Sequence, residues 1–245
     1  MNWIAIAAIG AGVGLLGGMF GKGGSAVATP LLYLAGVPAI VAVASPLPAT
    51  IPSMLVAASA YWRRGFLDRE VLTWSIAFGV PATIAGAVAT RWIGGGVLVQ
   101  VTDVIVAGLG LRFLFGPSSP RETVRRPSAY RTRLVAVAII VGLAGGLLAN
   151  SGGFLLAPLY IAVLRLPIKD AFASSLSVAA ALAVPGTLVH AALGHIDWSV
   201  VVVFGATSIP LSYIGARLTL RSNSMRLERV YGAALTALGV CFVAL

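Results

Sequence analysis

Long apolar stretches alternate with short polar loops along the whole chain. No Lys, Arg, His, Asp or Glu occurs from residue 23 to 62. A helix of that length, at about 1.5 Å per residue, crosses a hydrocarbon core of roughly 30 Å twice. The pattern predicts an all-α polytopic membrane protein with about 8 to 10 membrane helices. The expected apolar segments are 3–20, 26–36, 39–62, 71–90, 97–115, 134–149, 154–164, 171–191, 198–216 and 230–245.

A repeat divides the chain into two similar halves. Residues 13–18 (VGLLGG) return as residues 141–146 (VGLAGG), at an offset of 142 − 14 = 128. After one inserted residue the matches continue at an offset of 129, in the pairs Gly65/Gly194, Asp68/Asp197 and Pro81/Pro210. The register persists over some hundred residues. We therefore expect a first transmembrane repeat at 1–115, a cytoplasmic linker at 116–133 and a second transmembrane repeat at 134–245.

The second apolar segment of each half is short. Segments 26–36 and 154–164 have eleven residues each, which as a helix reach about 17 Å and do not cross a bilayer unaided. We expect each to form a broken or re-entrant pair with the segment before it, covered by protein or lining a water-filled cavity. Whether these segments span the membrane or re-enter is left open by the sequence.

Composition and charge support the membrane prediction. The chain is 59% hydrophobic and 10% charged, with a net charge of +10, which excludes an ordinary water-soluble domain. The basic residues lie mainly in loops between apolar segments, a distribution that indicates topology and not nucleic-acid binding. The Arg-rich regions 63–70, 116–133 and 217–229 should be cytoplasmic, and loops 91–96 and 192–197 external. This orientation gives each half an odd number of crossings, so we expect an inverted repeat, a common transporter architecture.

The chain offers little for catalysis. Six of its seven acidic residues fall in loops or at segment ends, and His190 and His195 are the only histidines. No HExxH or GxSxG sequence occurs, and no cluster supplies a nucleophile, a base and an oxyanion site together. We predict neither catalytic residues nor a metal site. His190 fits a proton-coupled cycle or, more simply, an interfacial position.

Two glycine-rich junctions are the main candidate site. Glycines before a helix N-terminus permit unusual dihedral angles, and the unpaired amides that follow, at the positive end of the helix dipole, suit an anion. Alternatively, the glycines serve close helix packing and Lys22 extends to the membrane surface. The expected substrate-binding residues here are Gly21, Lys22, Gly23, Gly24, Ser25, Asn150, Ser151, Gly152 and Gly153.

Hydroxyl side chains extend the candidate site. Ser45 interrupts an apolar segment together with several prolines, and Ser174 and Ser175 occupy the matching region of the second half. A hydroxyl group can donate to an oxyanion, so we include all three serines among the expected substrate-binding residues. The alternative for any one of them is a hydrogen bond within its own helix.

The duplicated signature resembles that of a known family. The chain is similar to the TauE/SafE sulfite exporter family across nearly its whole length. The residues that carry the likeness are Gly17, Gly21, Gly23, Gly24 and Pro30, then Gly145, Gly146, Gly152, Gly153 and Pro158. The resemblance implies transport of small sulfur-containing anions, such as sulfite, thiosulfate or organic sulfonates, without a cofactor. Lys22, Ser25 and Asn150-Ser151 depart from the usual pattern, so the preferred anion can differ.

The sequence therefore predicts a secondary transporter, an exporter of a small sulfur-containing anion, and not an enzyme. The alternatives are a non-transporting membrane module, such as a receptor or assembly subunit, and a transporter of another small anion, such as a carboxylate. The expected partners are the anionic substrate and the lipid bilayer, without nucleic acid; a homo-oligomer is left open. We expect a multi-pass protein of a prokaryotic cytoplasmic membrane.

Overall fold

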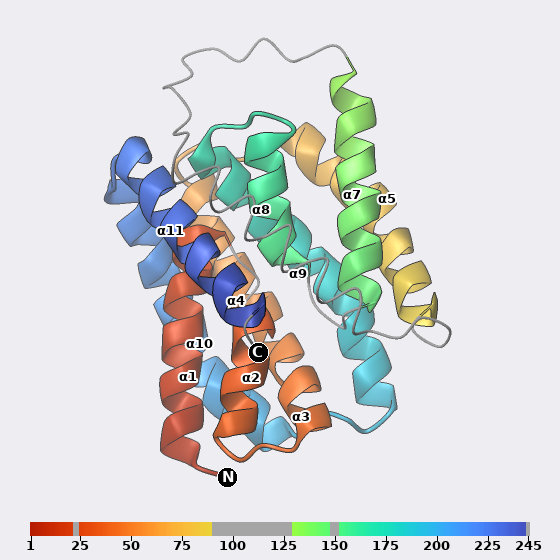
Figure 1. Ribbon diagram of the computed structural model, residues 1–245, viewed down its shortest axis with the longest axis vertical. Helices are drawn as coiled ribbons and strands as arrows, with labels where there is room; N and C mark the ends of the chain where they lie inside the picture. The colour runs from red at the N-terminus through yellow and green to blue at the C-terminus, as the bar shows by residue number, and fades with distance from the viewer. Residues whose placement is uncertain (22–24, 90–128, 148–151, 244–245) are drawn as a thin grey trace.

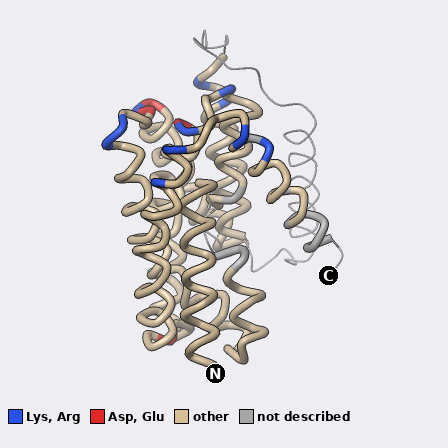
Figure 2. Tube along the Cα trace, turned by 90° about the vertical axis from the view of Figure 1, so that its left-hand side faces the viewer, with Lys and Arg blue, Asp and Glu red and all other residues tan. Residues whose placement is uncertain are grey.

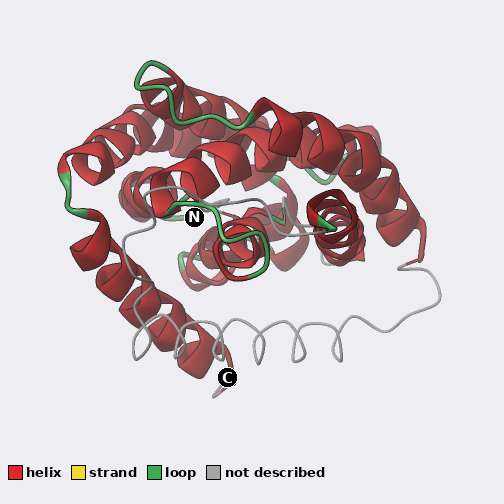
Figure 3. Ribbon diagram, turned by 90° about the horizontal axis from the view of Figure 1, so that it is seen from above, coloured by secondary structure: helices red, strands yellow, loops and turns green. Residues whose placement is uncertain are grey.

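The computed structural model describes residues 1–21, 25–89, 129–147 and 152–243 (Figure 1). These residues form helices and no strands (Figure 3). Six helical stretches among them are long and apolar enough to cross a membrane, so the chain is a multi-pass membrane protein. The helices are α1 (Trp3–Phe20), α2 (Ser25–Leu34), α3 (Ala39–Ala44), α4 (Pro46–Trp62), α5 (Arg69–Ala89), α7 (Tyr130–Leu147), α8 (Gly153–Ala162), α9 (Ile168–Ala192), α10 (Trp198–Arg221) and α11 (Ser224–Val243).

The predicted segments match most of these helices closely, with four main differences. Helix α10 continues to Arg221, five residues beyond the predicted segment 198–216 and into the expected loop 217–229. Segment 39–62 is divided at Ser45 into α3 and α4, because Pro46 has no N–H with which to continue the backbone hydrogen bonds. Helix α7 begins at Tyr130, inside the expected linker 116–133. Helix α11 begins at Ser224, six residues before the predicted apolar segment. Segment 97–115 lies outside the described residues.

The loops that repeat in sequence also repeat in conformation. The Asp68 carboxylate accepts hydrogen bonds from the amides of Glu70 and Val71 at the start of α5, at 2.9 and 3.3 Å. Its counterpart Asp197 accepts from the amides of Ser199 and Val200 at the start of α10, at 2.9 and 3.4 Å. Both carboxylates satisfy otherwise unpaired donors of the first helical turn. The repeat therefore extends from the sequence to the N-caps of these helices.

The main helix contacts join the two halves crosswise. Helix α1 packs along α10, and α7 packs along α5, so each pair takes one helix from each half. A side chain added at Gly14 or Gly18 of α1 would overlap backbone atoms of α10, at Ser208 and Ser212 respectively. We call this line of backbone contact the first glycine seam. Such small residues let two helix backbones approach within van der Waals contact.

The second pair of helices has the same arrangement. A side chain added at Gly142 or Gly146 of α7 would overlap the backbone of α5, at Gly79 and Thr83 respectively. We call this the second glycine seam. Its residues are those of the first seam moved by the repeat offsets of 128 and 129. The same contacts therefore recur at equivalent positions, an arrangement compatible with an inverted repeat.

Helices α2 and α8 each return toward the end of the bundle from which the preceding helix starts. The amide of Asn2, which begins α1, donates to the carbonyl of Ala35, just after α2, at 3.3 Å. Each short helix has ten residues, or about 15 Å, half of a hydrocarbon core. The α1–α2 hairpin and the α7–α8 hairpin enter from opposite ends of the bundle (Figure 1).

The charged residues mark the two ends of the bundle. The described Lys and Arg residues gather at one end (Figure 2), whereas the N-terminus and the loop between α9 and α10, which contains Asp197, lie at the other (Figure 1). The Arg-rich regions 63–70 and 217–229, and the start of α7, all belong to the basic end. The positive-inside rule predicts that this end faces the cytoplasm. The expected grouping is confirmed for 63–70, 217–229 and the described end of the linker, 129–133; residues 116–128 lie outside the described residues.

The inverted repeat can be tested by labelling cysteines. The repeat partners Arg64 and Leu193 are both exposed, and they lie in loops that we assign to opposite faces of the membrane. In a Cys241→Ser background, Arg64→Cys should react with a membrane-impermeant maleimide only from the cytoplasmic side, and Leu193→Cys only from the outside. Labelling of both cysteines from the same side would contradict the inverted repeat.

Candidate functional site

The first glycine-rich junction is anchored on α9. Helix α1 ends at Gly21, whose φ of 64° lies in the left-handed region that favours glycine. The Ser175 hydroxyl is 2.7 Å from the Gly21 carbonyl oxygen and 3.0 Å from that of Phe172, so it can donate to either. The structure thus brings together two of the expected site residues. In this conformation Ser175 binds the backbone of the junction, and its proton is not free for an anion.

The second junction begins at Gly152, which has a φ of 65° and precedes α8. A side chain at this position would contact the Val141 Cγ1 atom at 2.8 Å. Gly152 is the N-cap and has no side chain, so among the described residues no side-chain acceptor satisfies the first amides of α8. The Leu155 amide donates to the Gly152 carbonyl oxygen at 3.0 Å, so the amides that precede Leu155, with the helix dipole, are left for an external acceptor.

The remaining junction residues are only partly described. Helix α2 begins at Ser25 and α8 at Gly153. Because each helix is only ten residues long and ends near one end of the bundle, its N-terminus lies at membrane depth. The expected site residues Lys22, Gly23, Gly24, Asn150 and Ser151 lie outside the described residues, and their role stays a prediction.

The three expected serines do not form one cluster. Ser45 lies between α3 and α4, and its hydroxyl accepts a hydrogen bond from the amide of Asp197 at 3.0 Å, at the end opposite the arginines. Ser174 lies in the second turn of α9, near the basic end, and its fully buried hydroxyl has no hydrogen-bond partner among the described residues. One small anion cannot touch both serines in this conformation. The structure therefore places only Ser175 at a junction.

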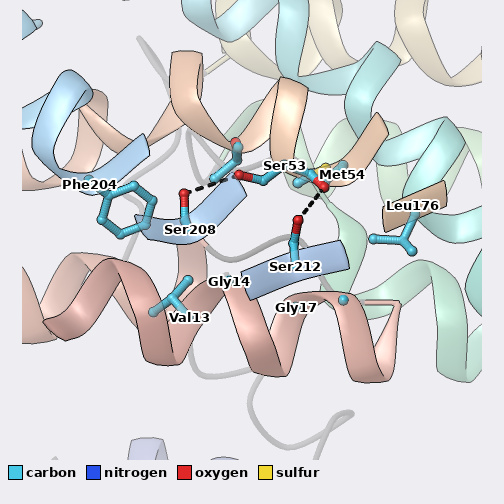
Figure 4. A pocket seen from close by; sticks show the side chains of 11 residues that line it. Val13, Gly14, Gly17, Ser53, Met54, Leu176, Phe204, Ser208 and Ser212 are labelled. Carbon is cyan, nitrogen blue, oxygen red and sulfur yellow. Dashed lines mark hydrogen bonds between the residues drawn. The ribbon is translucent and has the colours of Figure 1, made fainter. Parts of the chain in front are cut away.

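A small, largely apolar cavity beside three serines was not among the predicted features. It has a volume of about 20 Å³ and lies between α1, α4 and α10, beside Gly14, Gly17 and Gly18 of the first seam (Figure 4). The hydroxyls of Ser53 and Ser208 are 3.1 Å apart, and the Ser212 hydroxyl is 2.8 Å from the Ser53 carbonyl oxygen. This space is enough for about one water molecule, and therefore not for an oxyanion.

The equivalent position in the other half is apolar. The repeat offset of 129 places Leu182 where the first half has Ser53, and Gly79 where the second half has Ser208. The Leu182 Cδ2 atom lies 3.1 Å from where a Cβ on Gly79 would be, so a leucine side chain fills the space. The two otherwise similar seams thus differ in polarity. Aligning the two repeats position by position in the sequence reveals this difference in polarity.

The described residues hold no group of three or more His, Cys, Asp or Glu side chains that could bind a metal ion. The two histidines form a pair with their Nδ1 atoms 3.2 Å apart. This pair lies where α9 ends, in the loop that leads to Asp197, far from both junctions along the helix. The interfacial position of His190 and a coupled proton there both stay predictions.

Comparisons with known proteins place the chain among membrane transporters. The family model described as "Sulfite exporter TauE/SafE" matches residues 6–242. A "Probable membrane transporter protein" of Xylella fastidiosa (strain 9a5c) is 29% identical over 249 residues, covering 96% of this chain and 93% of the relative. The "Probable membrane transporter protein YunE" of Bacillus subtilis (strain 168) is 22% identical, covering 91% and 89% respectively.

No solved structure matches the chain. The family match extends over both halves and includes both glycine-rich junctions. The relatives align over nearly their full lengths, so the likeness concerns the whole membrane domain. The chain therefore belongs to the TauE/SafE sulfite exporter family of membrane transporters.

Proposed function

We propose that this protein is a secondary transporter that exports a small sulfur-containing anion, such as sulfite, thiosulfate or an organic sulfonate, across a prokaryotic cytoplasmic membrane. The observation that carries the proposal is the pair of half-length helices, α2 and α8, whose N-termini begin at membrane depth after glycine-rich junctions. Half-helices of this kind point their positive ends at anionic substrate groups in other transporters. The family description supports sulfite or a related anion as the substrate.

The substrate would be held mainly by backbone amides. An oxyanion accepts several hydrogen bonds, and the first turn of a helix offers unpaired N–H groups aligned with the dipole. At α8, Gly152 leaves these donors without a side-chain acceptor. We assign Gly23, Gly24, Ser25, Gly152 and Gly153 to this amide cradle. Backbone donors suit sulfite and sulfonates alike, so neighbouring side chains would select among them.

Lys22, Asn150 and Ser151 would supply the side-chain contribution. Lys22 brings a full positive charge to the first junction, whereas Asn150 and Ser151 bring neutral donors to the second. Ser175 would act indirectly, because it fixes Gly21 on α9. The two junctions would therefore contribute unequally to the binding free energy.

The two hairpins would also provide alternating access. The α1–α2 hairpin enters from the external end and the α7–α8 hairpin from the basic end. If the halves are inverted repeats, exchanging their conformations converts an inward-open state into an outward-open one. This mechanism needs no cofactor and no catalytic residue, and its energy comes from the gradient of the anion or of a coupled ion.

A flux assay tests the transport function. Proteoliposomes that contain the purified protein should take up radiolabelled sulfite, thiosulfate or an organic sulfonate faster than protein-free liposomes, with competition among these anions. Carboxylates of similar size should compete weakly. Rapid carboxylate uptake without sulfur-anion uptake would support a transporter of other anions, and no uptake of any anion would support a non-transporting module.

Lys22 offers a test of the binding site with a matched control, because the chain has only one other lysine. Lys22→Ala should weaken binding by about 1.5 to 3 kcal/mol, or roughly ten- to hundredfold, as expected for a lost charge-assisted hydrogen bond. Asn150→Ala should cost less, about 0.5 to 1.5 kcal/mol. Calorimetric titration of the anion that gives flux into each purified variant measures these losses.

Lys169→Ala is the control. The Lys169 ammonium group donates to the Leu220 carbonyl oxygen at 3.2 Å, near the basic end of the bundle, so its loss should leave anion affinity unchanged within about twofold. Lys22→Arg keeps the charge but needs more room among the neighbouring glycines, and should bind with intermediate affinity. If Lys22→Ala and Lys169→Ala have equally small effects, Lys22 extends to the membrane surface and does not contact the anion.

A further inference from the structure

A second basic feature lies at the cytoplasmic end of the bundle, apart from both junctions. A pocket of about 230 Å³ opens where α4 and α10 end side by side. Four arginines line it together with Tyr213 and Leu220, and none of the junction residues takes part. We call it the arginine pocket. Its arginines are Arg63, Arg64, Arg217 and Arg221.

Within the described part of the chain, no acidic group balances the charge of this pocket. Among the residues that the structure describes, no carboxylate forms an ion pair with any of its four guanidinium groups. Arg131, on α7 at the same end of the bundle, differs because its Nε atom donates to the Glu70 Oε1 atom at 2.8 Å. Like charges in one pocket repel each other, so an anionic ligand would relieve a repulsion that the fold imposes.

The pocket also orders its arginines. Arg217 follows Tyr213 by one helical turn, and its guanidinium carbon lies 4.7 Å from the centre of the tyrosine ring, within the range of a cation–π contact. Arg221 follows one turn later on the same face of α10. Guanidinium groups arranged in this way can bind two oxygens of one oxyanion each.

A simpler explanation accounts for part of this charge. Basic residues in the last turn of a helix interact favourably with its dipole, and cytoplasmic loops are enriched in arginine. Either effect places arginines around the helix ends in contact with solvent, and the four pocket arginines are also exposed. Neither effect requires four of them to gather around one pocket whose described lining has no carboxylate, which is why a ligand is the better explanation.

We propose that the arginine pocket is a phosphate-binding site that takes the headgroup of an anionic phospholipid or a free phosphate. The adjoining surface favours the lipid. Trp62, Ile214 and Leu218, on the same two helices, are 40, 46 and 44% exposed, so an apolar surface that acyl chains can cover begins beside the pocket. Basic pockets between membrane helices on the cytoplasmic side bind such headgroups.

Two pairs of substitutions with equal loss of charge test the proposal. The pocket variant combines Arg63→Gln with Arg217→Gln. The control variant combines Arg133→Gln with Arg226→Gln; these two arginines are exposed at the same end of the bundle but lie outside the pocket. Native mass spectrometry would count phosphatidylglycerol bound to each purified protein as the lipid concentration is raised, with phosphatidylcholine as the zwitterionic comparison. Calorimetry with inorganic phosphate forms the second arm.

The wild-type protein should bind one phosphatidylglycerol at least about tenfold more tightly than phosphatidylcholine, and the pocket variant should lose about tenfold or more of that affinity. The control variant should change by less than about twofold. Phosphate binding with the same arginine dependence, but without lipid preference, would support the proposal with free phosphate as the ligand. Equal losses in both variants, or no binding of either ligand by the wild type, would overturn it.

Discussion

Backbone contact between helices at the two glycine seams is the interaction on which this structure depends. Inside a bilayer, apolar side chains gain little by leaving lipid for protein, so helix association relies on close packing. Gly14 and Gly18 bring α1 against the backbone of α10. Gly142 and Gly146 bring α7 against α5 in the same way. Each seam joins a helix of one half to a helix of the other, so the seams hold the two halves together.

The seams also determine where the candidate anion site lies. Helices α1 and α7 end in the two glycine-rich junctions, from which α2 and α8 start. Because the seams fix α1 and α7 along their length, they fix the depth at which the short helices begin. The Ser175 hydroxyl then attaches the first junction to α9, at the Gly21 carbonyl. In the proposed transporter, a small change of angle at one seam would move one junction relative to the other.

Much of this architecture was predictable because it follows from local patterns. Apolar length predicted the membrane helices, and the arginines predicted which loops share an end of the bundle. The matching of Asp68 with Asp197 in sequence was confirmed by their equivalent N-caps. The sequence left open whether α2 and α8 cross the membrane or re-enter. For α2, the hydrogen bond between the Asn2 amide and the Ala35 carbonyl shows that the chain returns to the end of the bundle where α1 starts.

Other features could not be predicted because they depend on which helices meet. A glycine pattern indicates close packing but does not name the partner, so the crosswise pairing of the halves was not foreseen. Ser45 and Ser175 have similar sequence surroundings, yet the Ser45 hydroxyl accepts a hydrogen bond from the Asp197 amide and the Ser175 hydroxyl donates toward the Gly21 carbonyl. The small cavity beside the first seam brings together Ser53 and Ser208, which are 155 residues apart in the sequence.

The most direct test of this account compares glycines on α1. Gly14 faces the first seam, whereas a side chain added at Gly12 would meet no atom within 4 Å. Gly14→Leu should markedly lower the thermal unfolding midpoint in detergent, by an amount that corresponds to about 1 to 3 kcal/mol or more. Gly12→Leu should leave it unchanged or raise it, because leucine favours a helix more than glycine does. Equal midpoints for the two variants would contradict the central role of the seam.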